Sequence, residues 1–256
     1  HRDLHLSLRR QRQMCIRDST SAVIVKNQTM RSRLISLGAQ PAQLVISPSG
    51  ADEQRFQGSI PASMPPRFLA VGRFVAKKGP LDTLEAFALL QGLTDHADAC
   101  SLVMVGDGPL LSVVQERAHQ LGLEHLVQFP GVLSPDAVVQ EMRRARVFVQ
   151  HSRTAEDGDE EGCPVSVMEA QLCGLPVVAT RHGGITDVVV DQQTGTLVEE
   201  GDRRGMAEAM ALLADRPELA AAWGAAGQRR SQARFTVKHH VDQITMLLND
   251  LVDHRQ

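Results

Sequence analysis

Short runs of apolar residues alternate along most of the chain with longer segments in which apolar residues recur every three or four positions. The first pattern is typical of buried strands, and the second is typical of helices that pack on a sheet. From residue 67 onward, helical segments separate six such runs: RFLAVG, SLVMVG, LVQF, RVFVQ, PVVAT and GTLVEE. Because the runs are continuously apolar, they predict an α/β fold with a doubly wound parallel sheet.

Proline, serine and glycine mark the ends of several predicted helices. One helix begins at Pro80 and another at Pro164, because proline has no amide proton to leave unsatisfied in a first turn. The helix from Pro164 ends at Gly174, and a third helix begins with the Ser-Pro-Asp sequence at 134–136. Ligands of such sheets bind at the carboxyl ends of the strands, so functional residues are expected there.

The chain upstream of the six runs has a different pattern. It predicts a short strand at 22–25, a helix that ends at Gly38 and a second strand at 43–46. A segment rich in proline, serine and glycine follows and is interpreted as a linker. The predicted organisation has five parts: a tail at 1–19, a first unit at 20–47, the linker at 48–66, a main domain at 67–235 and a C-terminal helix at 236–256.

The tail at 1–19 is rich in arginine and lacks any helix or strand period, so it is predicted to be disordered. It is interpreted as non-native sequence at the end of a gene fragment rather than as an arm that binds nucleic acid.

Composition excludes several classes of protein. The 256 residues are 43% hydrophobic and 22% charged, and the net charge of −3 gives no reason to expect nucleic acid as a partner. The four cysteines are scattered and predict neither a disulfide framework nor a zinc site. No apolar run reaches the ~20 residues that span a bilayer. We expect a cytoplasmic protein without a transmembrane segment, for which peripheral contact with a membrane stays open.

Cationic residues follow the first strand of the main domain, in GRFVAKKG. Gly72 allows a sharp turn, Arg73 follows directly, and Lys77 and Lys78 precede the helix that begins at Pro80. Arginine can bind two oxygens at once and a helix N-terminus carries a partial positive charge, so this arrangement predicts a receptor for a diphosphate. The alternative is an ordinary solvated helix start.

Two carboxylates flank the start of another helix, in EEGCPVSVMEA. Glu161 precedes the helix and Glu169 lies inside it, with a turn of Gly162, Cys163 and Pro164 between them. Carboxylates accept hydrogen bonds from sugar hydroxyls, and free amides of the turn could hold a phosphate or sugar oxygen, so the pattern favours a sugar nucleotide. Two ordinary surface acids explain the spacing equally well.

Several segments in a fixed order resemble those of a known family. They are PSGADEQRF, VGRFVAKKG, VMVGDGP, VQFPGVLS, EEGCPVSVMEAQLCGLPVVAT, HGGITDVV and GTLVEEGD. From residue 20 to about 250, the chain resembles the C-terminal part of retaining GT-B glycosyltransferases of the group 1, or family 4, type. The resemblance implies a Rossmann-like donor-binding domain, preceded at 20–47 by a remnant of a second Rossmann-like domain that holds the acceptor.

The resemblance also implies roles for individual residues. Arg73 and Lys78 would bind the donor diphosphate, Glu161 would lie near the donor sugar, and Glu161 and Glu169 would form the E-x7-E pair of the family, with Glu169 on the ribose. Catalytic roles would fall to Glu161, Arg73 and Lys78. The full donor-binding set would comprise Gly72, Arg73, Lys78, Gly131 and Val132 against the base, Glu161, Gly162, Cys163, Pro164, Glu169, and Thr196 near the phosphates.

The implied reaction is transfer of a hexosyl group from a nucleoside diphosphate to an acceptor hydroxyl with retention of configuration. Charge builds up on the leaving diphosphate, so the cations should help most in the transition state. No metal or other cofactor is expected, and the acidic segment at 156–162 is interpreted as a solvated loop. The expected partners are a nucleotide-sugar donor and a carbohydrate or lipid-linked acceptor.

Other features leave alternatives open. His151 and His182 lie near strand ends and could contact the ligands or be structural. In TRHGGITD, Thr186 and Asp187 stand where the family commonly has Pro-Glu. A nucleotide-sugar epimerase or hydrolase of GT-B fold and a noncatalytic binding domain are the other functions considered. Because most of an acceptor domain is missing from the sequence, we expect this chain to bind the donor without transferring sugar.

Overall fold

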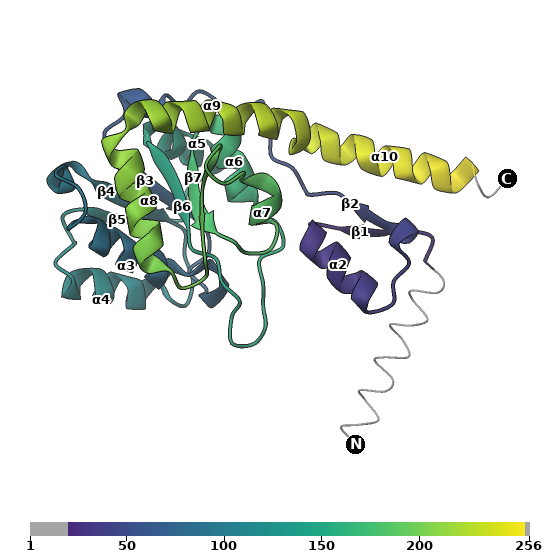
Figure 1. Cartoon of the computed structure of the whole chain (residues 1–256), viewed down its shortest axis with the longest axis horizontal. Helices are drawn as coiled ribbons and strands as arrows, with labels where there is room; N and C mark the ends of the chain where they lie inside the picture. The colour runs from purple at the N-terminus through teal and green to yellow at the C-terminus, as the bar shows by residue number, and fades with distance from the viewer. Residues whose placement is uncertain (1–19, 254–256) are drawn as a thin grey trace, which may run out of the picture.

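The main body of the protein is a six-stranded parallel sheet with the strand order β5-β4-β3-β6-β7-β8 (Figure 1). The computed structural model describes residues 20–253, so the tail predicted at 1–19 and the last residues, 254–256, lie outside them. The strands are β3 (Arg67–Val71), β4 (Ser101–Val105), β5 (Val127–Gly131), β6 (Val147–Gln150), β7 (Val177–Thr180) and β8 (Gly195–Val198). The predicted doubly wound α/β fold is therefore confirmed.

The strand order places β3 in the middle of the sheet, beside β6. Strands β4 and β5 extend the sheet to one side of β3, and β7 and β8 extend it to the other side of β6. In a doubly wound sheet, a crevice opens above the carboxyl ends of the strands where the strand order reverses. The loops that follow β3 and β6 flank that crevice.

Helices cover both faces of this sheet (Figure 1). Side chains of α3, α4 and α8 pack on one face and those of α5, α6 and α7 on the other, while α9 packs against α6 and α8. The helices are α3 (Pro80–Leu90), α4 (Leu111–Gln120), α5 (Pro135–Arg144), α6 (Val165–Cys173), α7 (Ile185–Val188), α8 (Arg203–Asp215), α9 (Pro217–Arg234) and α10 (Val237–Asp253).

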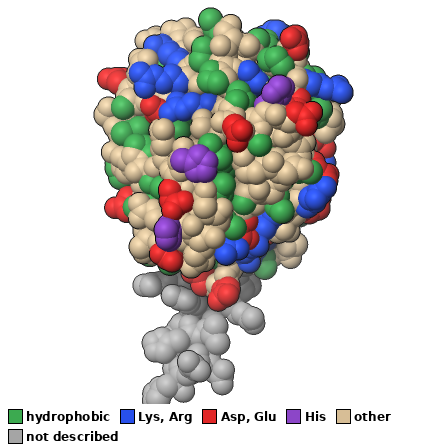
Figure 2. All heavy atoms as spheres, turned by 90° about the vertical axis from the view of Figure 1, so that its left-hand side faces the viewer, with side chains coloured by type: hydrophobic (Ala, Val, Ile, Leu, Met, Phe, Trp, Pro, Cys, Tyr) green, Lys and Arg blue, Asp and Glu red, His purple; other side chains and the backbone are tan. Residues whose placement is uncertain are grey.

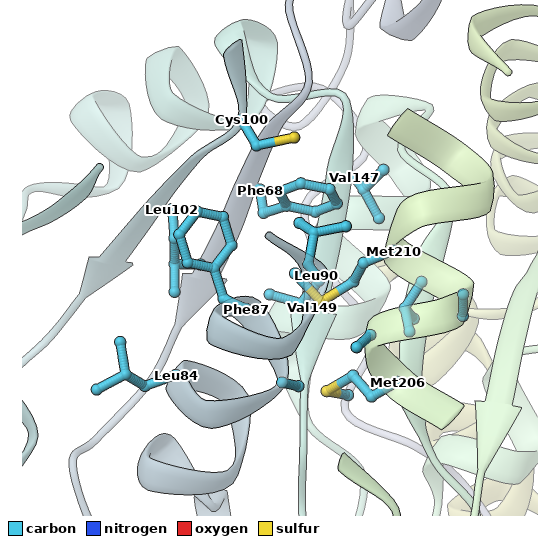
Figure 3. Packing of buried hydrophobic residues seen from close by; sticks show 14 of the residues in the cluster. Phe68, Leu84, Phe87, Leu90, Cys100, Leu102, Val147, Val149, Met206 and Met210 are labelled. Atoms are coloured by element: carbon cyan, nitrogen blue, oxygen red, sulfur yellow. The ribbon is translucent and has the colours of Figure 1, made fainter. Parts of the chain in front are cut away.

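Alternate residues of each strand feed the two apolar layers. Phe68 of β3 belongs to the layer shown in Figure 3, and the next residue, Leu69, belongs to the layer on the opposite face. Phe68 packs edge-on against Phe87 of α3 with a distance of 6.1 Å between ring centroids. Because both faces are covered by helices, the strands are apolar throughout, which is the pattern that the sequence shows.

The predicted starts of α3, α5 and α6 and the predicted end of α6 agree with the structure to within one residue, whereas α2 ends at Ser36, two residues before the predicted end at Gly38. Pro80 is the first residue of α3, and the Oγ of Ser134 accepts a hydrogen bond from the amide of Ala137 at 3.3 Å in the first turn of α5. Helix α6 begins one residue after Pro164, and it ends at Gly174, whose φ of 91° is left-handed. These boundaries fix where the site loops leave the sheet.

A small unit precedes the main domain. It consists of β1 (Val23–Val25), α2 (Gln28–Ser36), the short 3-10 turn η1 (Pro41–Gln43) and β2 (Leu44–Ile46), and the two strands pair in parallel apart from the larger sheet. Figure 1 shows α10 extending from the main domain over this unit. The Oγ of Ser47 lies 2.7 Å from Nδ1 of His240 on α10, so the helix and the unit are in contact.

The connecting segment, predicted as a linker at 48–66, has only one short helical turn, η2 (Pro61–Ser63). Short 3-10 turns also occur at η3 (Ala76–Lys78) and η4 (Ala97–Ala99).

On the face shown in Figure 2, cationic and anionic side chains of the described residues are interspersed and form no large patch of one charge. Within residues 20–253, no helix is both long enough and apolar enough to cross a membrane.

Candidate functional site

The loop after β3 and the start of α3 form one wall of a pocket at the carboxyl edge of the sheet. Gly72, Arg73, Lys78 and Gln150 are among the residues that line it. The stem of Lys78 packs on Gly72, where an added Cβ would lie 3.6 Å from Cδ of Lys78. Gly79 has a left-handed φ of 52° and no space for a side chain, which brings the start of α3 close to the end of β6.

The two cations of this wall have different surroundings. Arg73 is exposed, and its guanidinium has no hydrogen bond or ion pair with any residue from 20 to 253. Lys78 forms an ion pair with Glu161, with 2.5 Å between Nζ and Oε2, and the two side chains are only 17% and 12% exposed. The structure therefore brings together the cationic and acidic motifs that the sequence analysis treated separately.

The neighbouring Lys77 points to a different partner. Its Nζ lies 3.0 Å from Asp159, in the acidic loop that precedes α6. Another acid of this loop, Glu160, lies 3.3 Å from the guanidinium of Arg33 on α2. Within the described part of the chain, no group of three or more His, Cys, Asp or Glu side chains is arranged to hold a metal ion.

Hydrogen bonds hold the backbone on both sides of the peptide bond between Glu161 and Gly162. The amide of Glu161 donates to Nε2 of His182 at 2.9 Å, and the carbonyl of Gly162 accepts from the amide of Gly184 at 2.7 Å. The side-chain amide of Asn27, on the small unit, also donates to that carbonyl. The amides of Gly162 and Cys163 donate to no residue described by the structure, so they are free to bind an anionic oxygen.

Glu169 is half-buried on α6, and its carboxylate has no hydrogen bond or ion pair with another residue in the range 20–253. Burial raises the pKa of Glu169 to about 7, and the positive charge of Arg55 lowers it by a smaller amount. A buried carboxylate without a partner reduces the stability of a fold, and such groups are frequent where a ligand binds.

The remaining predicted residues belong to the two outer strands of the sheet or follow them. Gly131 ends the outer strand β5 with a left-handed φ of 74°, and Val132, which follows it, is 75% exposed. Thr196 pairs with Val178 in the interior of β8, and its Oγ1 is buried without a hydrogen bond to any other described residue. Two strands, β6 and β7, separate β8 from β3, so the structure does not bring Thr196 together with Lys78.

The two histidines have structural contacts. His151 is fully buried, and its Nε2 accepts from the amide of Gly201 at 2.8 Å. Burial lowers the pKa of His151, which favours the neutral ring that this hydrogen bond requires. His182 is 4% exposed and touches the site through the backbone of Glu161. Of the two interpretations considered for these histidines, the structural one describes their contacts in this structure.

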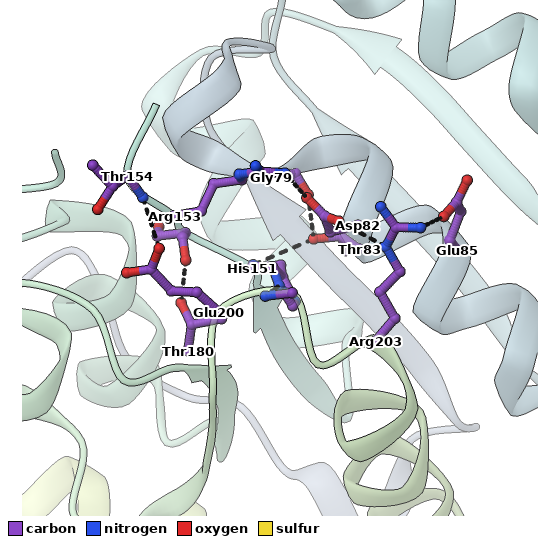
Figure 4. Close-up of polar contacts among 12 residues, drawn as sticks. Gly79, Asp82, Thr83, Glu85, His151, Arg153, Thr154, Thr180, Glu200 and Arg203 are labelled. Atoms are coloured by element: carbon purple, nitrogen blue, oxygen red, sulfur yellow. Dashed lines mark hydrogen bonds and ion pairs between the residues drawn. The ribbon is translucent and has the colours of Figure 1, made fainter. Parts of the chain in front are cut away.

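Sequence reasoning missed a polar network at the start of α3, which Figure 4 shows. Asp82 of α3 is buried and accepts from Nε of Arg203 at 2.7 Å, and it also forms an ion pair of 3.5 Å with Arg153. Arg203 also pairs with Glu85, one turn further along α3. The network ties the start of α8 to the start of α3. The available signal in the sequence was Asp82, an acidic residue within a largely apolar helix.

Comparison with known proteins places this site in a family. A model of the family described as glycosyl transferases group 1 matches residues 51–230. The putative colanic acid biosynthesis glycosyltransferase WcaL of Salmonella typhimurium is 35% identical over 181 residues, which cover 70% of this chain and 44% of the relative. A GDP-mannose-dependent alpha-(1-6)-phosphatidylinositol monomannoside mannosyltransferase of Mycobacterium tuberculosis is 33% identical over 232 residues, which cover 86% of this chain and 59% of the relative.

The fold also matches solved glycosyltransferase structures. Anabaena Alr3699/HepE in complex with UDP and glucose superposes with a TM-score of 0.79 over 92% of this chain and 65% of that chain, at 22% sequence identity. That similarity shows the GT-B fold. The chain spans about half the length of the curated relatives it matches. The family match contains every predicted donor-site residue from Gly72 to Thr196, and the chain therefore belongs to the group 1 glycosyl transferases.

Proposed function

We propose that this chain is the donor-binding part of a retaining glycosyltransferase, which transfers a hexosyl group from a nucleoside diphosphate sugar to a hydroxyl of a carbohydrate or lipid-linked acceptor. The observation that carries the proposal is the meeting of Arg73, Lys78 and Glu161 at the carboxyl edge of the sheet. Two cations beside a helix start suit a diphosphate, and the carboxylate next to them suits a sugar hydroxyl.

The relatives support a nucleotide-sugar donor without identifying it. The Mycobacterium tuberculosis relative is named as GDP-mannose-dependent, whereas the Anabaena structure contains UDP and glucose. The base, the sugar and the acceptor therefore stay outside the proposal. The exposed loop at Gly131 and Val132 is the place where we expect the base to lie, and Glu169 is the expected acceptor for ribose hydroxyls.

The proposed reaction depends mainly on charge. The bond between the anomeric carbon and the diphosphate breaks, the acceptor oxygen bonds to that carbon on the same face, and the acceptor proton passes to the departing diphosphate. Arg73 and Lys78 would stabilise the negative charge that builds up on the diphosphate. When the diphosphate binds Lys78, Glu161 loses its partner and becomes available to the donor sugar. The proposal includes no metal ion, because cationic side chains perform the neutralisation.

Calorimetry with the purified chain tests the donor proposal. UDP, GDP and ADP are titrated against uridine, guanosine and adenosine, with and without EDTA. We expect at least one diphosphate to bind about tenfold more tightly than its nucleoside, and EDTA to leave that affinity unchanged. If no diphosphate binds, or if EDTA abolishes binding, the proposal is wrong.

Transfer is tested with the full-length protein, since this chain spans only about half of its curated relatives. We propose that the chain alone binds donor but transfers no sugar, because the acceptor is not positioned. Products are identified by mass spectrometry and the anomeric configuration by NMR. An epimerase or hydrolase would convert the donor without an acceptor, and a noncatalytic binding protein would bind the donor without turnover.

A further inference from the structure

The imidazole ring of His182 lies between the backbone of Glu161 and the side chain of Glu200. Its Nε2 accepts from the amide of Glu161 at 2.9 Å, and its Nδ1 lies 2.5 Å from Oε1 of Glu200. The other carboxylate oxygen of Glu200 accepts from the amide of Thr154 at 2.9 Å. A continuous chain of hydrogen bonds therefore runs from the loop after β6, through Glu200 and the imidazole, to the backbone of Glu161.

These contacts specify one form of the imidazole ring. A backbone amide can only donate, so Nε2 of His182 must be unprotonated where it meets Glu161. The proton of the neutral ring is then on Nδ1, from which it is donated to Glu200. Burial alone would raise the pKa of Glu200, but its hydrogen bonds to His182 and to the amide of Thr154 outweigh burial and lower it, so the acceptor is ionised. An imidazolium would place two N–H groups against each other at Glu161.

The turn that carries His182 leaves little freedom for movement. An added Cβ on Gly183 would lie 2.0 Å from the carbonyl oxygen of Glu161, and one on Gly184 would lie 2.2 Å from that of Gly162. The turn therefore packs directly on the peptide units that it positions, and a change at His182 is transmitted to them.

Charged groups act on the ring from both sides. The carboxylate of Glu200 lies at Nδ1, and the amide of Glu161 donates to Nε2. Arg153 lies close enough to Glu200 to interact with its charge. The adjacent Arg181 is engaged by two other acids, Asp191 and Glu199, and Lys78 is engaged by the side chain of Glu161.

We propose that His182 is a positioning residue for Glu161: its neutral ring, protonated on Nδ1, fixes the peptide unit that carries this carboxylate, and protonation of the ring displaces Glu161 and weakens the binding of a nucleoside diphosphate sugar. The claim that His182 affects the affinity for a sugar nucleotide rests on the proposed function. The claim that its neutral ring accepts from the amide of Glu161 does not, and it is tested without a ligand.

The ligand-free test is NMR of the chain labelled with ¹⁵N. At pH 7.5 we expect His182 to be the neutral Nδ1–H tautomer, with a scalar coupling between its Nε2 and the amide nitrogen of Glu161 across the hydrogen bond. The other histidine signals are assigned by substitution. An Nε2–H tautomer, an imidazolium at this pH or the absence of the coupling would overturn the proposal, whether or not the protein binds sugar nucleotides.

The ligand test uses UDP-glucose and GDP-mannose, whose diphosphate diesters do not titrate near neutral pH, and compares affinities between pH 5.5 and 8. His182→Gln keeps an acceptor for the amide but cannot be protonated, whereas His182→Leu has no acceptor. The matched control is His119→Gln, because His119 also contacts a glutamate but is exposed on α4. Glu169 also titrates in this range, so the effect of His182 is the difference between the wild-type and His182→Gln profiles.

We expect wild type and His119→Gln to lose affinity together as the pH falls, and His182→Gln to lose about threefold to tenfold less. His182→Leu should bind about tenfold more weakly than wild type at pH 8, where the loss of a buried hydrogen bond is fully felt. If His182→Gln and wild type have the same pH profile, the ring does not position Glu161 through its protonation state. If neither sugar nucleotide binds any variant, the proposed function fails and the NMR result alone decides on His182.

Discussion

The ammonium group of Lys78 lies 2.5 Å from the carboxylate of Glu161, and this ion pair joins the loop after β3 to the loop before α6. Each residue neutralises the other in the absence of ligand. A diphosphate must therefore compete with Glu161 for Lys78, whereas Arg73 has no side-chain partner among residues 20–253 and is available at once. The two cations should respond differently to substitution.

Arg73→Ala should weaken binding of a nucleoside diphosphate by about tenfold or more and leave nucleoside affinity and the free energy of unfolding nearly unchanged, because its guanidinium is exposed and pairs with no side chain in the described part of the protein. Lys78→Ala should weaken the same ligand and also destabilise the fold, since Glu161 is left largely buried without a counter-charge. Calorimetry and urea denaturation measure the two effects.

The control for both variants is Lys77→Ala, which removes the same type of side chain next to Lys78 but from an ion pair with the exposed Asp159. We expect a much smaller loss of diphosphate affinity for this control. Equal losses for diphosphate and nucleoside in Arg73→Ala and Lys78→Ala would remove the diphosphate assignment.

Glu169→Gln should stabilise the protein above pH 7. Burial raises the pKa of Glu169 to about 7 in the folded chain, from an ordinary value of 4.5. Its contribution to stability is therefore fully present below pH 4.5 and is lost as the pH rises through 7. The loss is on the order of 3 kcal/mol. Glutamine does not ionise, so the variant should gain up to this amount at pH 8 and nothing near pH 4.5.

Urea denaturation of wild type and Glu169→Gln at pH 5 and pH 8 measures this difference, with Glu116→Gln on the exposed side of α4 as the control. A gain of the same size at both pH values would mean that the carboxylate is not destabilised by burial.

Glu169→Gln should also affect ribonucleotides and 2′-deoxyribonucleotides differently. If the Glu169 carboxylate accepts from ribose hydroxyls, Glu169→Gln should weaken a ribonucleoside diphosphate by about tenfold and its 2′-deoxy analogue much less, because hydrogen bonds to charged groups contribute more than those to neutral ones. Affinities are measured by calorimetry at pH 8, where the wild-type carboxylate is ionised. Matching losses for the two ligands would place the ribose elsewhere. A variant that is more stable but binds less well would explain why Glu169, which has no partner among residues 20–253, is an acid.

Local patterns predicted the strands and helices well, because the signals are local. The spacing of apolar residues indicates the type of element, and its start or end is marked by residues such as Pro80, Ser134 and Gly174. The same patterns predicted which loops reach the carboxyl edge of the sheet.

Contacts between loops could not be predicted in this way. The pair of Lys78 and Glu161 depends on β3 and β6 being neighbours, and the hydrogen bond from Glu161 to His182 depends on the order of β6 and β7. The spacing of residues along the chain predicts neither contact. Thr196 illustrates the converse, because a motif placed it in the donor set although the sheet order separates its strand from β3.

Asn27 of the small unit contacts the loop before α6 through the carbonyl of Gly162. Asn27 is buried, its Oδ1 accepts from the amide of Met30 at 2.6 Å as the cap of α2, and its side-chain amide donates to the carbonyl of Gly162. Asn27→Asp keeps the cap but replaces the donor with a carboxylate oxygen that faces the carbonyl.

We expect Asn27→Asp to reduce the free energy of unfolding by about 1–3 kcal/mol, because two acceptors then meet where a buried hydrogen bond was. Hydrogen exchange should become faster at the amide of Gly184, which donates to the same carbonyl of Gly162, while α2 keeps its protection because its cap remains. Ser36→Ala is the control, since Ser36 is exposed at the other end of the same helix and bonds only to Arg33 within it. Faster exchange in α2 with no change at Gly184 would mean that Asn27 only caps its helix. Faster exchange at Gly184 would mean that the small unit holds the loop before α6 in place.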